Sequence, residues 1–175
     1  MIGSMMRFAL IFLAAIVAFR TIAVASPEEP APSETPPLEQ KSTVHFASLR
    51  SDKVNLRTGP SADYPIDWVF VRKGLPVEIL AAFDTWRKIR DSDGTVGWVH
   101  QGMLSSRRSV LVTGATRALR QDPKPDGAVV AELEPGVVAR LSRCNPGWCE
   151  VKAHGYSGWL ERDQLWGLEA GEVVQ

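Results

Sequence analysis

A series of short motifs occurs twice in this chain, in the same order, and this duplication restricts the possible folds more than any other feature. The paired motifs lie 61 to 63 residues apart, and the spacing changes only in segments expected to be loops. This regularity indicates two copies of one structural unit, which we place at residues 43–112 and 113–170. The pairs are Asn55-Leu56-Arg57 with Ala118-Leu119-Arg120, Val71-Arg72-Lys73-Gly74 with Leu133-Glu134-Pro135-Gly136, Trp86 with Trp148, Gly97-Trp98-Val99 with Gly158-Trp159-Leu160, and Leu104 with Leu165.

Each unit is predicted to consist of short β-strands. Apolar and polar residues alternate over short runs, and no segment after residue 43 shows sustained helical periodicity. The 14 glycines and 12 prolines suit the many turns that join short strands. About six strands in roughly 60 residues close most easily into a small barrel, which hides the sheet edges. We therefore expect an all-β protein with two tandem small barrels, and Ser109–Val112 as the closing strand of the first.

The phase of the strands separates core residues from surface residues. If Ile89 and Val99 point into the first barrel, Trp86 and Trp98 point outward, because alternate residues of a strand face opposite sides. The second unit repeats this pattern, with its own two motif tryptophans outward. Outward tryptophans leave two interpretations open. They form a platform for a ligand, or they seal a second small core under a loop or against the other domain.

The lengths of two turns predict the register of the tryptophan hairpins. A three-residue loop over residues 92–94 pairs Lys88 with Trp98, and a two-residue loop over residues 154–155 pairs Glu150 with Trp159. Both registers place two tryptophans diagonally on one face, within reach of each other. These pairs are Trp86 with Trp98 and Trp148 with Trp159.

The two cysteines are expected to form a disulfide. Cys144 and Cys149 bracket a Pro146-Gly147 dipeptide, which suits a type II turn in a tight hairpin that sets the cysteines opposite each other. A zinc site that adds His154 has neither the usual ligand spacing nor a fourth ligand. A catalytic Cys149–His154 pair lacks an orienting group, and a paired cysteine is no nucleophile. We expect no metal site, no catalytic residue and no cofactor.

The N-terminus has the features of an export signal. Arg7 precedes twelve residues without a charged side chain, and Ala23-Val24-Ala25 gives a cleavage site between Ala25 and Ser26. Residues 1–25 are therefore interpreted as a signal peptide, with an uncleaved N-terminal anchor as the alternative. The apolar run is short for a permanent membrane span. Residues 26–42 contain five prolines and four glutamates, which predicts a disordered spacer.

The charge balance of the chain argues against a nucleic-acid partner. The sequence holds 20 Lys and Arg and 20 Asp and Glu, so its formal net charge is zero. Proteins that bind nucleic acid through a basic field carry an excess of positive charge. The part after residue 42 is also close to neutral, which favours neither a polyanion nor a strongly acidic partner.

The duplicated motifs resemble the bacterial SH3-like (SH3b) domain family. The first unit carries NLRTGPS, VRKG, WRKIR and GWV, followed by a Met-Leu turn, and the second carries LRQDP, LEPG, CNPGWCEV, SGWL and DQLWG. The resemblance covers about residues 43–168. The second unit departs from it at LRQDPKPDG, where the Arg-x-Gly-Pro turn is missing, so a family contact at that turn is not carried over.

This resemblance implies a binding protein rather than an enzyme. In SH3-like folds the loop after NLRTGPS borders the ligand groove, which implies Arg57, Tyr64, Trp68 and Trp86 as contacts, with Trp98 on the same outward face as Trp86. Stacking aromatic rings beside an arginine suit a peptide stem or a glycan. SH3-like domains often accompany cell-wall hydrolases, so the implied partner is cell-wall peptidoglycan or an envelope protein, met in the periplasm or after secretion. The alternative is a structural or regulatory subunit docked on a larger envelope enzyme.

Overall fold

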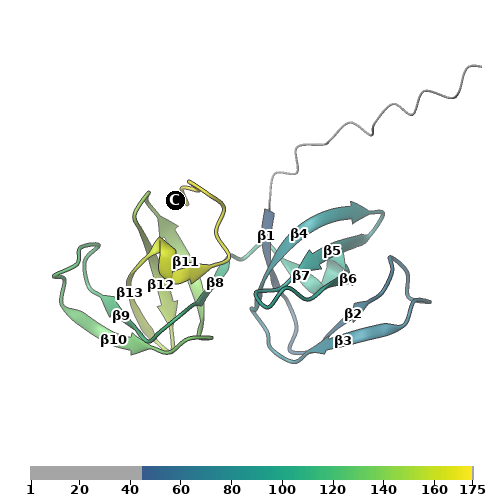
Figure 1. Ribbon diagram of the computed structural model, residues 1–175, viewed down its shortest axis with the longest axis horizontal. Coiled ribbons are helices and arrows are strands. Elements are labelled where there is room, and N and C mark those ends of the chain that lie inside the picture. The colour runs from purple at the N-terminus through teal and green to yellow at the C-terminus, as the bar shows by residue number, and fades with distance from the viewer. Residues whose placement is uncertain (1–44, 175) are drawn as a thin grey trace, which may run out of the picture. The chain divides into compact units, whose positions relative to one another are not determined.

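The protein is almost entirely β-structure, arranged as two antiparallel sheets of seven strands each (Figure 1). The computed structural model describes residues 45–174, and both sheets belong to one compact unit of the chain. The predicted signal peptide, its cleavage site and the spacer over residues 26–42 lie outside the described residues. Within residues 45–174, no helix has the length and apolar character needed to cross a bilayer.

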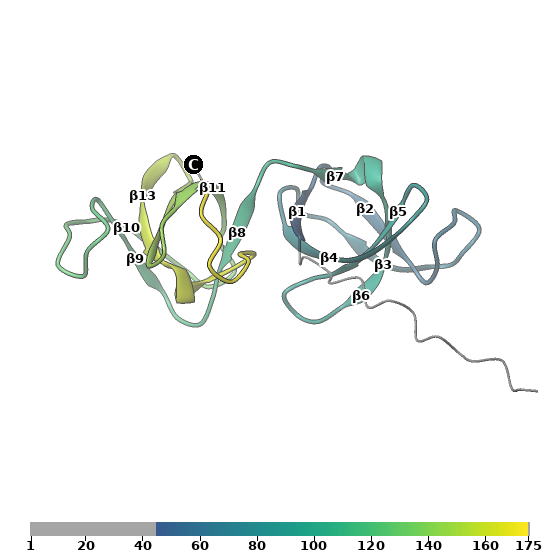
Figure 2. The same cartoon turned by 90° about the horizontal axis from the view of Figure 1, so that it is seen from above.

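The first sheet has the strand order β3-β2-β6-β5-β4-β1-β7 and curls around its own core (Figure 2). A 3₁₀ turn, η1 (Gln101–Met103), precedes its last strand. The strands are β1 (His45–Leu49), β2 (Val54–Arg57), β3 (Ile66–Phe70), β4 (Pro76–Phe83), β5 (Trp86–Arg90), β6 (Val96–His100) and β7 (Leu104–Ser105).

The second sheet repeats this order strand for strand, as β10-β9-β13-β12-β11-β8-β14. It has the same 3₁₀ turn in the same place, η2 (Arg162–Gln164). The internal repeat and the all-β fold predicted from the sequence are thereby confirmed. The strands are β8 (Ser109–Val112), β9 (Arg117–Arg120), β10 (Val129–Leu133), β11 (Val138–Cys144), β12 (Trp148–Ala153), β13 (Tyr156–Glu161) and β14 (Leu165–Trp166).

The strand Ser109–Val112 belongs to the second sheet, and its predicted place as the closing strand of the first unit is wrong. This strand, β8, pairs with β11 and β14. It is the counterpart of β1, which pairs with β4 and β7 in the first sheet. The sequence shows an apolar run here, but not which sheet it joins, because its partners lie 25 or more residues further along the chain.

The predicted strand phases and registers agree with the structure. Ile89 and Val99 are fully buried in the first sheet. Lys88 pairs with Trp98, and Glu150 pairs with Trp159. Each sheet has its own cluster of buried apolar residues, and the two clusters share no member. Each barrel is therefore stabilised around its own core, in the way expected of a duplicated unit.

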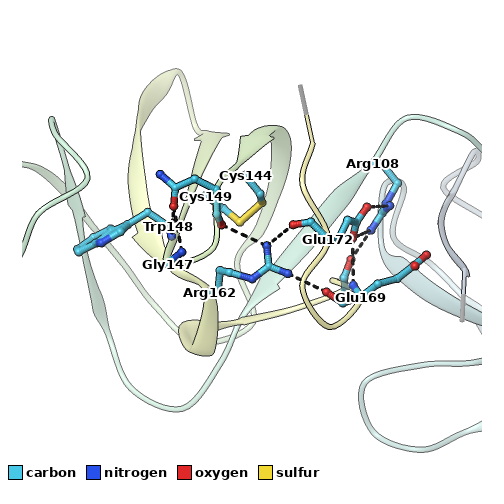
Figure 3. Close-up of a disulfide and its surroundings, with 10 residues drawn as sticks. Arg108, Cys144, Gly147, Trp148, Cys149, Arg162, Glu169 and Glu172 are labelled. Carbon is cyan, nitrogen blue, oxygen red and sulfur yellow. Dashed lines mark hydrogen bonds and ion pairs between the residues drawn. A yellow bond between two sulfur atoms is a disulfide. The ribbon is translucent and has the colours of Figure 1, made fainter.

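The predicted disulfide joins Cys144 and Cys149 across the β11–β12 hairpin (Figure 3). The type II turn expected between them is wrong, because Gly147 is not among the described residues with positive φ. The side chain of Asn145 provides the reason. Its Oδ1 accepts hydrogen bonds from the backbone N–H of Gly147 at 3.0 Å and of Trp148 at 2.7 Å, which holds a different turn.

The chain after β14 folds back over the disulfide hairpin (Figure 3). Val174 forms a β-bridge with Cys144. The guanidinium of Arg162 donates to the carbonyl oxygens of Glu172 at 2.6 Å and Glu169 at 2.7 Å. The Glu172 carboxylate forms an ion pair with Arg108, just before β8. We call residues 168–174 the C-terminal clasp.

Candidate functional site

The outer face of strands β2, β6 and β5 carries three of the five candidate residues. Arg57 pairs with Trp98, and Trp86 pairs with His100. Paired residues of neighbouring strands point to the same side of a sheet, and so do residues two apart in one strand. Arg57, Trp86 and Trp98 therefore share one face, with His100 among them, while Ile89 and Val99 occupy the core behind it.

A hollow of about 290 Å³ lies on this face, and Arg57 and Trp86 both border it. Its other residues were not predicted as contacts from the sequence. Their signal was present, because each lies two or four residues from a predicted outward residue or beside the Met-Leu turn. The residues that line the hollow are Lys53, Asn55, Arg57, Trp86, His100 and Met103.

Trp86 and His100 form one wall of the hollow. Their rings meet edge to face, with centroids 5.7 Å apart and an interplanar angle of 84°. The His100 Nδ1 accepts a hydrogen bond from the backbone N–H of Gly102 at 3.1 Å, at the start of η1. This bond places the proton of the neutral imidazole on Nε2. Trp86 was predicted to lie near Trp98, and the two share a face, but the ring that Trp86 contacts is that of His100.

Arg57 is held in place by the loop between β2 and β3. Its Nη1 donates to the Tyr64 carbonyl oxygen at 2.6 Å. The Tyr64 ring lies over Gly59, where a Cβ atom would stand 2.5 Å from the ring carbons. Arg120 of the second sheet makes the corresponding bond to the Gly127 carbonyl oxygen at 2.8 Å. The bond is thus a repeated structural feature that fixes the guanidinium beside the loop.

Tyr64 and Trp68 are exposed, as the sequence predicted, with 46% and 56% of their surface accessible. Neither borders the hollow. Trp68 pairs with Leu56, whose neighbour Arg57 faces the opposite side of the sheet. The structure therefore brings Arg57 and Trp86 together, places Trp98 beside them, leaves Tyr64 at the margin and separates Trp68.

The second sheet has the same framework with different chemistry. Trp148 occupies the position of Trp86, and its strand partner is Glu161 in place of a histidine. Ala118 stands where the first sheet has Asn55. The polar groups that surround the hollow in the first sheet are therefore not repeated. Within residues 45–174, no cluster of three or more His, Cys, Asp or Glu side chains has the arrangement of a metal site.

Comparison with known families identifies the fold. The family described as the bacterial SH3 domain matches residues 50–106 and again residues 114–167. The chain belongs to the bacterial SH3 domain family. The two matched regions correspond to the two sheets, so the protein carries a tandem pair of bacterial SH3 domains. No curated protein matches the chain.

Several solved structures are similar to this tandem pair at low identity. NlpC1 and NlpC2 from Trichomonas vaginalis match 70% and 71% of the chain at 15% and 14% identity, each with a TM-score of 0.33. An NlpC/P60 family protein from Bacillus cereus matches 71% of the chain at 15% identity, with a TM-score of 0.32. The chain spans 45%, 48% and 57% of the lengths of these three proteins.

Proposed function

We propose that this protein is a non-catalytic binding module that acts outside the cytoplasm and holds cell-wall peptidoglycan in the hollow of its first SH3 domain. The hollow between Arg57, Trp86 and His100 is the observation that carries the proposal. It combines an aromatic wall with hydrogen-bonding and cationic groups, a combination that orients a small polar ligand. Membership of the bacterial SH3 domain family supports a binding role.

The chemistry of the hollow suits both parts of a peptidoglycan unit. The half-buried Trp86 ring offers an apolar face for a sugar or a peptide side chain. Arg57 and Lys53 offer positive charge to the carboxylates of a peptide stem. Asn55 and the free Nε2–H of His100 add neutral donors. The second domain lacks this set, so we assign binding to the first.

A sedimentation assay with purified cell-wall sacculi tests this function. The native protein is expected to pellet with the sacculi, and Trp86→Ala to weaken binding about five- to tenfold through loss of ring contact. Trp148→Ala removes the equivalent tryptophan of the second domain and is expected to leave binding unchanged. Both variants are also measured by thermal unfolding. A loss of several kcal/mol for Trp86→Ala would assign that ring to the core instead.

Two results would contradict wall binding. The native protein would stay in the supernatant at low and moderate salt, or the two tryptophan variants would weaken binding equally. Either result would favour the second candidate function, a subunit that docks on a larger envelope protein.

The exposed edge strand β3 is the observation that favours the docking alternative. β3 is the terminal strand of its sheet, and its Ile66 and Trp68 expose 47% and 56% of their surface. An edge strand with large exposed apolar side chains is suited to pairing with another chain. Under this alternative, Trp68→Ala abolishes capture of a partner from envelope extract and Trp86→Ala does not.

A further inference from the structure

A larger cavity, of about 680 Å³, is lined by residues from both sheets and shares none of them with the hollow. Six of the chain's 20 Lys and Arg line it, and none of its 20 Asp and Glu does. We call this cavity the basic groove. Its six cationic residues are Arg50, Lys73, Arg107, Arg108, Arg140 and Lys152.

Most of these cations have no anionic partner. Among the described residues, Arg108 is the one member of the six that forms an ion pair, with Glu172. Arg50 donates from Nε to the Leu104 carbonyl oxygen at 3.1 Å. The other four are exposed and have no ion-pair partner within residues 45–174. Clustered charges of one sign inside a concave surface attract mobile anions strongly.

Two of the unpaired cations lie directly opposite each other on neighbouring strands. Arg140 of β11 pairs with Lys152 of β12. Like charges at such positions destabilise a sheet. At the equivalent position of the first sheet, Glu78 pairs with Arg90, and their side chains form an ion pair at 2.5 Å. The second domain thus has a repulsive pair where its sister domain has an attractive one, which is the arrangement expected where an anion binds between the two cations.

The walls of the groove narrow the class of anion. Strands β1, β11 and β12 each have a neighbour on both sides, so an acidic peptide cannot add to them as an extra strand. No aromatic residue lines the groove, so neither sugar rings nor nucleic-acid bases find a stacking partner. Recognition is left to the cations, and Arg and Lys both bind phosphate oxygens strongly.

We propose that the basic groove binds a polymer whose repeating units carry phosphate groups. The cavity is much larger than one phosphate and lies in the size range of sites for extended ligands. A chain with regularly spaced phosphates can engage several of the six cations at once. This site is independent of the hollow in the first domain, and its ligand differs in chemistry from a neutral glycan or a peptide stem.

Calorimetric titration of the full chain with short-chain inorganic polyphosphate tests the proposal. The native protein is expected to bind at about 50 mM salt and to lose affinity linearly on a log–log plot as salt rises. Arg140→Glu recreates the Glu78–Arg90 arrangement and occupies Lys152, so it is expected to weaken binding at least about tenfold. The slope of the salt dependence should fall by about 1.4, the value for two lost contacts on a single strand.

Lys88→Gln/Lys124→Gln is the matched control. It changes the net charge by the same amount as Arg140→Glu, but neither lysine lines the groove. Its affinity is expected to stay within about twofold of the native value. Arg107→Gln/Lys152→Gln removes two groove cations without forming a new ion pair, so it tests the site even if Arg140→Glu perturbs the fold.

Three results would overturn the proposal. The native protein would fail to bind polyphosphate at low salt. The control would lose as much affinity as the groove variants. Or polyglutamate or a single-stranded oligonucleotide of equal charge would bind as tightly as polyphosphate, which would assign the groove to an acidic polypeptide or to a nucleic acid.

Discussion

The glycine of each Gly-Trp motif lies where two strands approach closely. A Cβ atom on Gly97 would stand 2.6 Å from Leu56 Cγ and 2.9 Å from the Arg57 carbonyl oxygen. A Cβ atom on Gly158 would stand 2.5 Å from the Arg120 carbonyl oxygen. Neither glycine has a positive φ, so the lack of space, and not backbone conformation, requires glycine at these positions. The motif therefore combines a close strand contact with a tryptophan on the outer face.

Substitution at this contact is expected to be costly. Gly97→Ala should lower the free energy of unfolding by about 1–3 kcal/mol, because the added methyl group overpacks a buried site. Gly147→Ala is the control, since no atom lies within 4 Å of its Cβ position and its φ is not positive. Its effect should stay within about 0.5 kcal/mol. Urea unfolding measures both, and equal effects would show that space at Gly97 is not limiting.

Among the structural elements, the C-terminal clasp is the one whose stability depends on a perturbed carboxylate. Partial burial raises the pKa of Glu172, but the hydrogen bonds it accepts and the positive charges of Arg108 and Arg162 outweigh this effect. Its pKa therefore lies below the ordinary value of 4.5. A carboxyl with a lowered folded-state pKa adds stability above its unfolded pKa, and this stability is lost as the pH falls through the folded pKa.

The clasp is accordingly expected to open in acid. Amide hydrogen exchange of residues 168–174 should be slow at pH 6 and should accelerate as the pH falls below about 4.5, once Glu172 takes up a proton. Glu172→Gln should exchange rapidly at pH 6 already. Asp163→Asn, which removes an exposed carboxylate, is expected to behave as the native protein. Exchange that depends on pH in the same way with and without Glu172 would contradict this role.

At the scale of the whole molecule, the protein is a duplicated unit with two separate cores. The second core includes Val110 and Val112 of β8, which expose 0% and 1% of their surface. β8 also lies between β11 and β14, so two strands lose a partner without it. The second domain thus begins before residue 109, while its boundary was predicted at residue 113.

Two fragments test where the second domain begins. A chain of residues 107–175 contains β8 and is expected to fold, with a cooperative thermal transition and dispersed amide signals. A chain of residues 113–175 lacks two buried valines and a central strand, and is expected to remain unfolded. Cooperative folding of the shorter fragment would show that β8 is dispensable to the second domain.

Much of this fold could be predicted from local sequence patterns. The spacing of the repeated motifs gave the two units, because strands and turns of equal length recur with equal spacing. Alternation placed Ile89 and Val99 in the core and Trp86 outside it. The disulfide followed from two cysteines on one short hairpin. In the candidate site, Arg57 and Trp86 were predicted correctly as neighbours through the family resemblance, whereas His100 was given no role.

The sequence by itself determined the features that depend on residues close together in the chain: strand phase, hairpin register, the disulfide and the duplication. Only the tertiary structure decided the sheet to which Ser109–Val112 belongs, the separation of Trp68 from Arg57, and the turn held by Asn145. It also decided where the charges lie. A chain of zero net charge gathers six cations in one groove, because segments far apart in sequence meet there, and a charge count carries no information about position.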